Sequence, residues 1–183
     1  MSDRRRVAPF VALAVAIVAG ALFYVLAGAD SAPNETAETP LLDHPAPVAI
    51  GTLADGNSFD LSQRKGSWVV VNFFQSSCAP CKAEHPELVD FVAQQRTLGA
   101  DGAEFVTVVY DDDQASVEGF FAAEGGDWPI VYDEDGSIAV AFGVAKVPET
   151  WIIDPNGVVR GRIISRTEAD FLAAQLQRLR ERA

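Results

Sequence analysis

The feature that most constrains the fold is an apolar segment followed almost directly by two closely spaced cysteines. Residues 68–74 (WVVVNFF) are apolar except for one Asn and rich in β-branched side chains, which is typical of a strand buried on both faces. Cys78 and Cys81 come next, and residues 80–98 show helical spacing of apolar side chains. The sequence therefore predicts a strand, a short turn carrying Cys-Ala-Pro-Cys, and a helix that begins at this motif.

The rest of the chain from residue 48 alternates between strand and helix patterns. The turn Asp55-Gly56-Asn57 predicts a hairpin within residues 50–61. Asp113 is a predicted N-cap of one helix, and Thr167 is a predicted cap of the last. Further strands are predicted at 104–110, 129–132, 149–154 and 158–164, and helices at 114–124, 137–142 and 167–182. This order predicts an α/β layered domain.

The N-terminal part has a different pattern, with three arginines in residues 1–6 and no charge in residues 7–29. As a helix, the uncharged stretch would span roughly 34 Å, enough to cross a bilayer, and the charges around it favour a cytoplasmic N-terminus. We expect residues 1–6 to be a basic cytoplasmic N-terminus, 7–29 a single-pass signal-anchor in the cell membrane, 30–47 a flexible tether and 48–183 an extracytoplasmic domain. A cleaved signal peptide ending at Ala27-Gly28-Ala29 is the alternative, and it also exports the domain.

Charge and cysteine count narrow the function. The net charge of −12 argues against nucleic acid as a partner, because phosphate binding requires clustered Lys and Arg. The chain has only two cysteines, and a disulfide across two intervening residues constrains the unfolded chain too little to be a structural staple. A metal site is the alternative, but only His44 and His85 could add a ligand beyond carboxylates, so a Cys-Cys-His cluster would be incomplete. We expect redox chemistry with no metal and no cofactor.

A cysteine pair at the start of a helix has a specific chemical meaning. The unpaired amides and partial positive charge of the helix N-terminus stabilise a thiolate, so we expect the pKa of Cys78 to lie below the ~8.5 of a free thiol. Cys78 would attack a partner disulfide, and Cys81, one turn further along, would resolve the mixed disulfide. Pro80 suits the first turn, where its missing N–H is not needed.

Two segments carry a resemblance to a known family. Residues 71–88 (VNFFQSSCAPCKAEHPEL) resemble the motif of TlpA, ResA and CcmG (DsbE), the membrane-anchored thioredoxin-like proteins of cytochrome c maturation. Residues 142–150 (FGVAKVPET), with the turn at residues 154–157, resemble the family's second signature. The resemblance extends over about residues 47–182. It implies a thioredoxin-like fold, a central mixed sheet flanked by helices, with an N-terminal hairpin and a helix–strand insertion at residues 114–132.

The resemblance also implies roles for individual residues. Pro148 would be a cis-proline that faces the cysteines, Val147 would pair through its backbone with the substrate chain, and Pro80 would lie at the same substrate surface. Glu84 would be the buried acid that accepts a proton from Cys81, and Glu149 would be the acid after the cis-proline that contacts substrate. From the residues alone, an ordinary trans loop proline is the favoured interpretation of Pro148, and both glutamates could be solvated.

Three positions bear on how closely the family's pattern applies. Asn72 stands where thioredoxin itself has a buried Asp, which leaves the proton-handling role to Glu84. Ser77 replaces the Trp that usually precedes the first Cys, and Gln75 replaces an Ala. The missing Trp leaves the chemistry intact but removes a side chain that helps select the partner.

Three functions are compatible with these residues. In the first, a membrane electron donor of the CcdA/DsbD type reduces the cysteine pair, which then reduces apocytochrome c or another exported thiol protein before haem attachment. The second is a general exported oxidant or isomerase that uses the same cysteines in the opposite direction. The third is a non-catalytic copper-binding or chaperone module. The direction of electron flow depends on the redox potential relative to the compartment.

Overall fold

The computed structural model describes residues 3–27 and 33–183, with side chains at 12–24 and 33–183. The chain divides into two units, Met1–Ser31 and Ala32–Ala183, and the first contains α1 (Asp3–Ala27). Of the predicted anchor at residues 7–29, residues 28–29 and the side chains of 7–11 and 25–27 lie outside this description. Among the residues described, no helix is both long and apolar enough to span a bilayer.

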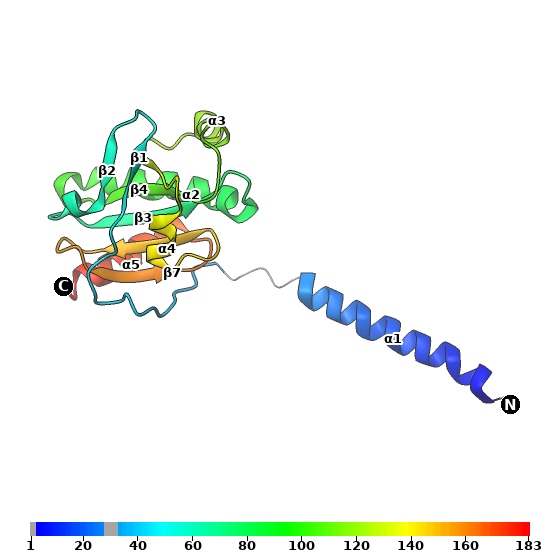
Figure 1. Ribbon diagram of the computed structural model, residues 1–183. Coiled ribbons are helices and arrows are strands. Elements are labelled where there is room, and N and C mark those ends of the chain that lie inside the picture. The colour runs from blue at the N-terminus through cyan, green and yellow to red at the C-terminus, as the bar shows by residue number, and fades with distance from the viewer. Residues whose placement is uncertain (1–2, 28–32) are drawn as a thin grey trace. The chain divides into compact units, whose positions relative to one another are not determined.

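Residues 33–183 form one mixed sheet of seven strands in the order β2-β1-β5-β4-β3-β6-β7 (Figure 1). Its centre is parallel, and antiparallel strands lie at both edges. The parallel strands are β3 (Val69–Phe74), β4 (Glu104–Val109) and β5 (Ile130–Tyr132). The others are β1 (Ile50–Leu53), β2 (Ser58–Asp60), β6 (Glu149–Ile153) and β7 (Val159–Ile163). Every side chain of β3 is buried, as its apolar pattern predicts.

Helices cover both faces of the sheet. On one face, α2 (Ala79–Thr97) and α5 (Ala169–Arg180) pack together over β3 and β6 through Leu88, Leu172 and their neighbours. On the other face, α4 (Ser137–Phe142) places Phe142 against Phe73 and Trp151. The inserted helix α3 (Gln114–Glu124) packs through Val117 beside β4 and β5. Two short 3₁₀ helices, η1 (Leu61–Arg64) and η2 (Gly99–Asp101), complete the domain. This is the thioredoxin-like fold with a hairpin and a helix–strand insertion that the sequence predicts.

The segment predicted to be a flexible tether differs from the prediction over residues 33–47. This segment follows the outer edge of β7, with bridges between Thr36 and Ile163 and between Pro45 and Val158. Leu41 and Leu42 pack against the core. The edge strand has unpaired backbone groups that need partners, and the segment supplies them although its sequence has no strand pattern. The folded domain therefore begins before residue 48.

The start of α5 also differs from the prediction. The N-cap is Glu168, which makes no side-chain cap bond, and Thr167 instead donates its hydroxyl to Asn34 Oδ1 at 3.2 Å. The free amide of Ala169 is satisfied from another helix, because it donates to Glu87 Oε2 on α2 at 3.0 Å. A carboxylate near a helix N-terminus is favourable, so α2 and α5 are joined by a cap as well as by apolar packing.

Candidate active site

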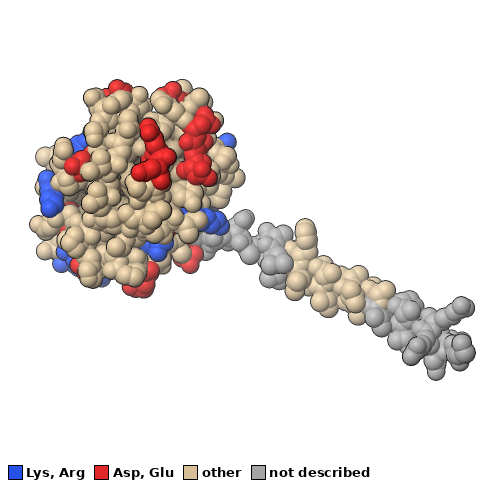
Figure 2. All heavy atoms as spheres, in the orientation of Figure 1, with Lys and Arg blue, Asp and Glu red and all other residues tan. Residues whose placement is uncertain are grey.

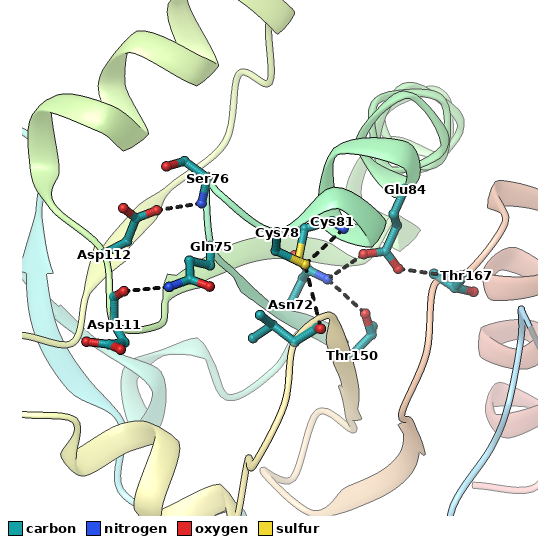
Figure 3. The surroundings of a disulfide bond; sticks show 11 residues. Asn72, Gln75, Ser76, Cys78, Cys81, Glu84, Asp111, Asp112, Thr150 and Thr167 are labelled. Atoms are coloured by element: carbon teal, nitrogen blue, oxygen red, sulfur yellow. Dashed lines mark hydrogen bonds between the residues drawn. A yellow bond between two sulfur atoms is a disulfide. The ribbon is translucent and has the colours of Figure 1, made fainter. Parts of the chain in front are cut away.

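The two cysteines lie where β3 passes into α2. Cys78 is the N-cap of α2, and it forms a disulfide with Cys81 in the first turn, with Cα atoms 5.2 Å apart (Figure 3). The backbone N–H of Cys81 donates to Cys78 Sγ at 3.2 Å. Cys78 is half-buried, whereas Cys81 is only 1% exposed. A partner can therefore reach the sulfur of Cys78, which also lies at the positive end of the helix dipole.

The cis-proline faces this pair. The peptide bond between Val147 and Pro148 is cis, as the family resemblance implies. The Val147 carbonyl oxygen lies 3.6 Å from Cys78 Sγ, which is a van der Waals contact in the disulfide form because that sulfur carries no hydrogen. Among the described residues, no partner satisfies the backbone N–H of Val147. The backbone N–H of Val147 is therefore a donor beside Cys78 Sγ that the domain itself does not use.

Glu84 lies three residues after Cys81 on α2 and is only 1% exposed. Its Oε1 accepts from the backbone N–H of Thr167 at 2.8 Å, and its Oε2 accepts from Asn72 Nδ2 at 3.3 Å (Figure 3). Burial raises the pKa of Glu84 from 4.5 to about 8, although both hydrogen bonds and the charge of Arg166 act in the opposite direction. The carboxyl group can therefore gain or lose a proton near neutral pH, which suits a general acid or base.

Asn72 connects this acid to the sheet. Its Nδ2 also donates to Thr150 Oγ1 at 3.0 Å, so the amide bridges β3, β6 and α2. Its Oδ1 is buried and, among the described residues, has no hydrogen-bond partner. The amide can turn over and accept a hydrogen from Glu84 when that carboxyl is protonated.

The loop before Cys78 is held by residues that sequence reasoning missed. Gln75 Nε2 donates to the backbone oxygen of Asp111 at 2.7 Å, and the backbone N–H of Ser76 donates to Asp112 Oδ2 at 2.5 Å (Figure 3). The sequence interpretation treated Gln75 only as a departure from the family and the aspartates as a solvated run. Gln75 is long enough to reach across to the next strand end, which an Ala could not do.

Two further predicted site residues, Glu149 and Pro80, differ in their exposure. Glu149 is only 3% exposed, and its carboxylate accepts two bonds from Arg162, at 2.9 and 3.1 Å, and one from Trp151 Nε1 at 2.8 Å. Glu149 therefore belongs to a buried ion pair, and the exposed alternative for this residue is wrong; its contact with substrate stays a prediction. Pro80 is exposed in the first turn of α2, beside the cysteines.

His85, the candidate metal ligand after the cysteines, is buried and packs against aromatic side chains. It is 2% exposed, its Nε2 lies 3.1 Å from the backbone oxygen of Gly125, and its ring packs against Phe120, Phe121 and Trp128. Burial lowers the pKa of this imidazole, which favours the neutral ring. His85 thus joins α2 to the inserted α3.

Comparisons with known proteins agree with this geometry. The family model described as Redoxin matches residues 29–174. The chain is 32% identical over 114 residues to "Thiol-disulfide oxidoreductase ResA" of Bacillus subtilis, covering 62% of each chain. It is also 32% identical over 121 residues to "Thiol:disulfide interchange protein HelX" of Rhodobacter capsulatus, covering 66% of this chain and 65% of HelX. The matched segment thus spans less than two thirds of these relatives.

Solved structures give the same answer for the fold. A thiol:disulfide interchange protein of the thioredoxin family from Chlorobium tepidum superimposes with a TM-score of 0.65 at 26% identity, covering 78% of this chain and 99% of that one. Because the family match extends over most of its length, the chain belongs to the Redoxin family, among the proteins similar to ResA, HelX and DsbE.

Proposed function

We propose that this protein is a thiol–disulfide oxidoreductase whose working group is the Cys78–Cys81 pair. The observation that carries the proposal is the asymmetry of the pair, since a reachable sulfur at a helix N-terminus is bonded to one that is almost fully buried. A structural disulfide would protect both sulfurs and would close a longer loop. The similarity to proteins named as thiol-disulfide oxidoreductases supports the same activity.

The reaction starts from the reduced pair. The Cys78 thiolate attacks one sulfur of a substrate disulfide, which forms a mixed disulfide and releases the other substrate sulfur as a thiolate. Cys81 then loses its proton and attacks Cys78 Sγ, so the second substrate sulfur leaves and the Cys78–Cys81 disulfide forms. Two electrons pass from the protein to the substrate, and each departing thiolate takes up a proton.

Glu84 is the proposed acceptor of the proton that Cys81 loses. It lies one helical turn beyond Cys81 on α2, on the same side of the helix. With a pKa of about 8, about a tenth of Glu84 is ionised at pH 7, and this carboxylate accepts the proton of Cys81 more readily than one with an ordinary pKa would. Val147, through its free backbone N–H, is the proposed partner of the substrate chain.

We propose reduction of exported proteins, with apocytochrome c as the substrate, as the physiological direction. The uncharged stretch at residues 7–29 and the arginines before it support a membrane-anchored domain on the extracytoplasmic side. The family resemblance supports a membrane electron donor of the CcdA/DsbD type. Near the thiolate, Lys82 and the helix N-terminus favour the reduced form, whereas Glu84, when ionised, opposes it. We expect a potential on the reducing side of about −200 mV.

Two measurements test the proposal. Cys81→Ser should trap substrates as mixed disulfides on Cys78, detectable by mass spectrometry, whereas Cys78→Ser should trap few. Equal trapping by both variants would contradict the assigned roles. Equilibration of the wild-type protein with glutathione and dithiothreitol buffers gives the potential, and a value near the ~−120 mV of strong oxidants would refute the reductant direction while leaving the exchange activity in place.

A further inference from the structure

The N-terminal segment of the domain reaches the buried acid of the active site through one loop. Residues 33–47 run along the outer edge of β7, and Figure 1 shows this light-blue segment passing below that strand. At its start, Asn34 contacts the loop of residues 164–168, which connects β7 to α5. The same loop carries Thr167, whose backbone N–H donates to Glu84. A segment that is distant in the sequence therefore lies close to the proposed proton acceptor.

Asn34 is bonded to three consecutive residues of this loop. Its backbone N–H donates to the backbone oxygen of Arg166 at 2.8 Å. Its Oδ1 accepts from the hydroxyl of Thr167 at 3.2 Å and from the backbone N–H of Glu168 at 2.9 Å, and its Nδ2 donates to Glu168 Oε2 at 3.3 Å. The backbone of Asn34 has a positive φ of 65°, which Asn adopts more readily than most residues. Both its backbone and its amide thus hold the loop.

Thr167 transmits this arrangement to the acid. It is fully buried, and both of its donors are used, the N–H by Glu84 Oε1 at 2.8 Å (Figure 3) and the hydroxyl by Asn34. Without the Asn34 amide, a buried hydroxyl would lose its acceptor, which is unfavourable. The loop would then move to satisfy that hydroxyl, and the N–H of the same residue would move with it, away from Glu84.

The loop supplies much of what stabilises the charge of Glu84. Burial raises the pKa of this carboxyl, and three groups lower it: the Thr167 N–H, then the Asn72 amide, then the charge of Arg166. Two of these three groups belong to the loop that Asn34 holds. The sheet contributes the uncharged side chains of Asn72 and Thr150. The other titratable groups on the helices around the site are Cys81 and Glu87 on α2 and Glu168 at the start of α5.

We propose that Asn34 is a positioning residue for the redox reaction, because it holds residues 166–168 and so keeps the N–H of Thr167 on Glu84. Glu84 is the group that takes the proton of Cys81, so Asn34 would act on the resolving step. It would not act on the first step, in which the Cys78 thiolate attacks the substrate disulfide without this proton transfer. The inference rests on the proposed role of Glu84.

A titration of the carboxyl group tests the contact without using activity. The full-length chain is labelled with ¹³C in its glutamate carboxyl groups, and the NMR signal of Glu84 is the one that Glu84→Gln removes. Asn34→Gly deletes the amide at a positive φ where Gly is not strained. It should raise the pKa of Glu84 and lower its ionised fraction at pH 7 about tenfold, which corresponds to about 1.4 kcal/mol. An unchanged or a lower pKa would overturn the inference.

A two-step reaction tests the effect on exchange. The reduced full-length chain reacts with dithiobis(nitrobenzoate), from which Cys78 displaces one thionitrobenzoate and Cys81 displaces the second, so two phases of absorbance report attack and resolution. Asn34→Gly should slow the second phase about threefold at pH 7, because the loss of ionised carboxylate is partly offset by its greater basicity. The pH profile of this phase should move to higher pH, whereas the first phase should not change.

Two variants separate positioning from a general loss of stability. Asn34→Asp with Glu168→Gln exchanges donor and acceptor in this pair, and it should restore the wild-type titration and second phase. It keeps the net charge, which matters in a chain of charge −12, and Figure 2 shows acidic side chains gathered in the upper part of the face that it presents. Leu41→Ala weakens the packing of the same segment against the core, and it should leave the titration and both phases unchanged.

The outcomes distinguish this inference from the proposed function. If Leu41→Ala changes the titration as much as Asn34→Gly does, or if the exchanged pair does not restore it, Asn34 has only a structural role and the inference is overturned. A second phase that Glu84→Gln slows and Asn34→Gly does not would overturn this inference alone. If Glu84→Gln leaves the second phase unchanged, the proposed role of Glu84 fails and the inference fails with it.

Discussion

Replacing Glu84 by Gln should remove a large part of the pH dependence of stability. The pKa of this carboxyl is 4.5 in its ordinary state and about 8 in the fold, where burial disfavours the charged form. Below pH 4.5 the group is protonated in both states. As the pH rises towards 8, the unfolded chain releases the proton while the folded chain keeps it, so the wild-type protein loses stability throughout this window and none above it.

The magnitude follows from the two pKa values. They differ by 3.5, from 8 minus 4.5. Each pKa unit corresponds to about 1.36 kcal/mol, so the ionisation of Glu84 removes about 5 kcal/mol of stability across the window. Gln can retain the hydrogen bonds, because its Oε1 can accept from Thr167 and its Nε2 can donate to the unpartnered Oδ1 of Asn72 after that amide turns over.

Urea unfolding of the wild-type protein and of Glu84→Gln at pH 5 and pH 8 measures the effect. Other groups titrate equally in both proteins, so the difference between the two pH dependences isolates Glu84. The free energy of unfolding of the variant should fall about 3.5 kcal/mol less than that of the wild-type protein between these pH values, because part of the window lies below pH 5 and the folded group is half ionised at pH 8. Parallel pH dependences would refute the reasoning, because they would mean that the carboxyl is solvated and ionises normally.

Two further predictions concern the fold around the site. Deleting residues 33–47 should lower stability by about 3 kcal/mol, because backbone bonds to β7 and the packing of Leu41 are lost. Deleting residues 1–29 should leave the melting temperature of the domain, measured by circular dichroism, unchanged. Equal melting temperatures of the two deletion variants would contradict a docked segment. Arg162→Met should lower stability by about 3–5 kcal/mol because it leaves the Glu149 carboxylate buried without its cation, and adding Glu149→Gln should recover most of the loss in urea unfolding.

The central part of the fold could be predicted because its signals are local and strong. The apolar pattern of β3 predicts a central strand that is buried on both faces, and the Cys-Ala-Pro-Cys motif then indicates where α2 begins. The turn at Asp154-Pro155-Asn156-Gly157 fixes the β6–β7 hairpin in the same way. In each case the residues that give the signal are the ones that make the structure.

The parts that sequence missed are held by contacts between distant segments. Residues 33–47 bind β7 through backbone hydrogen bonds. Every residue carries these backbone groups, so no pattern of side chains indicates that this segment is docked. The cap of α5 comes from Glu87 on α2, and Thr167, the local candidate, is used elsewhere. The role of Glu149 depends on Arg162 on β7, and the predicted hairpin places the two strands side by side without showing that these two side chains pair.

The position of the cysteine pair beside Asp111 and Asp112 follows from the parallel centre of the sheet. In register, Phe74 at the end of β3 lies opposite Val109 of β4, and Val109 lies opposite Tyr132 of β5. Parallel strands end at the same edge of a sheet, so the loops that follow these three strands lie side by side. They carry the active-site turn, Asp111 and Asp112, and the turn that begins at Asp133. The strand order alone therefore places these loops next to each other. The hydrogen bonds of Gln75 and Asp112 then connect loops that are already neighbours.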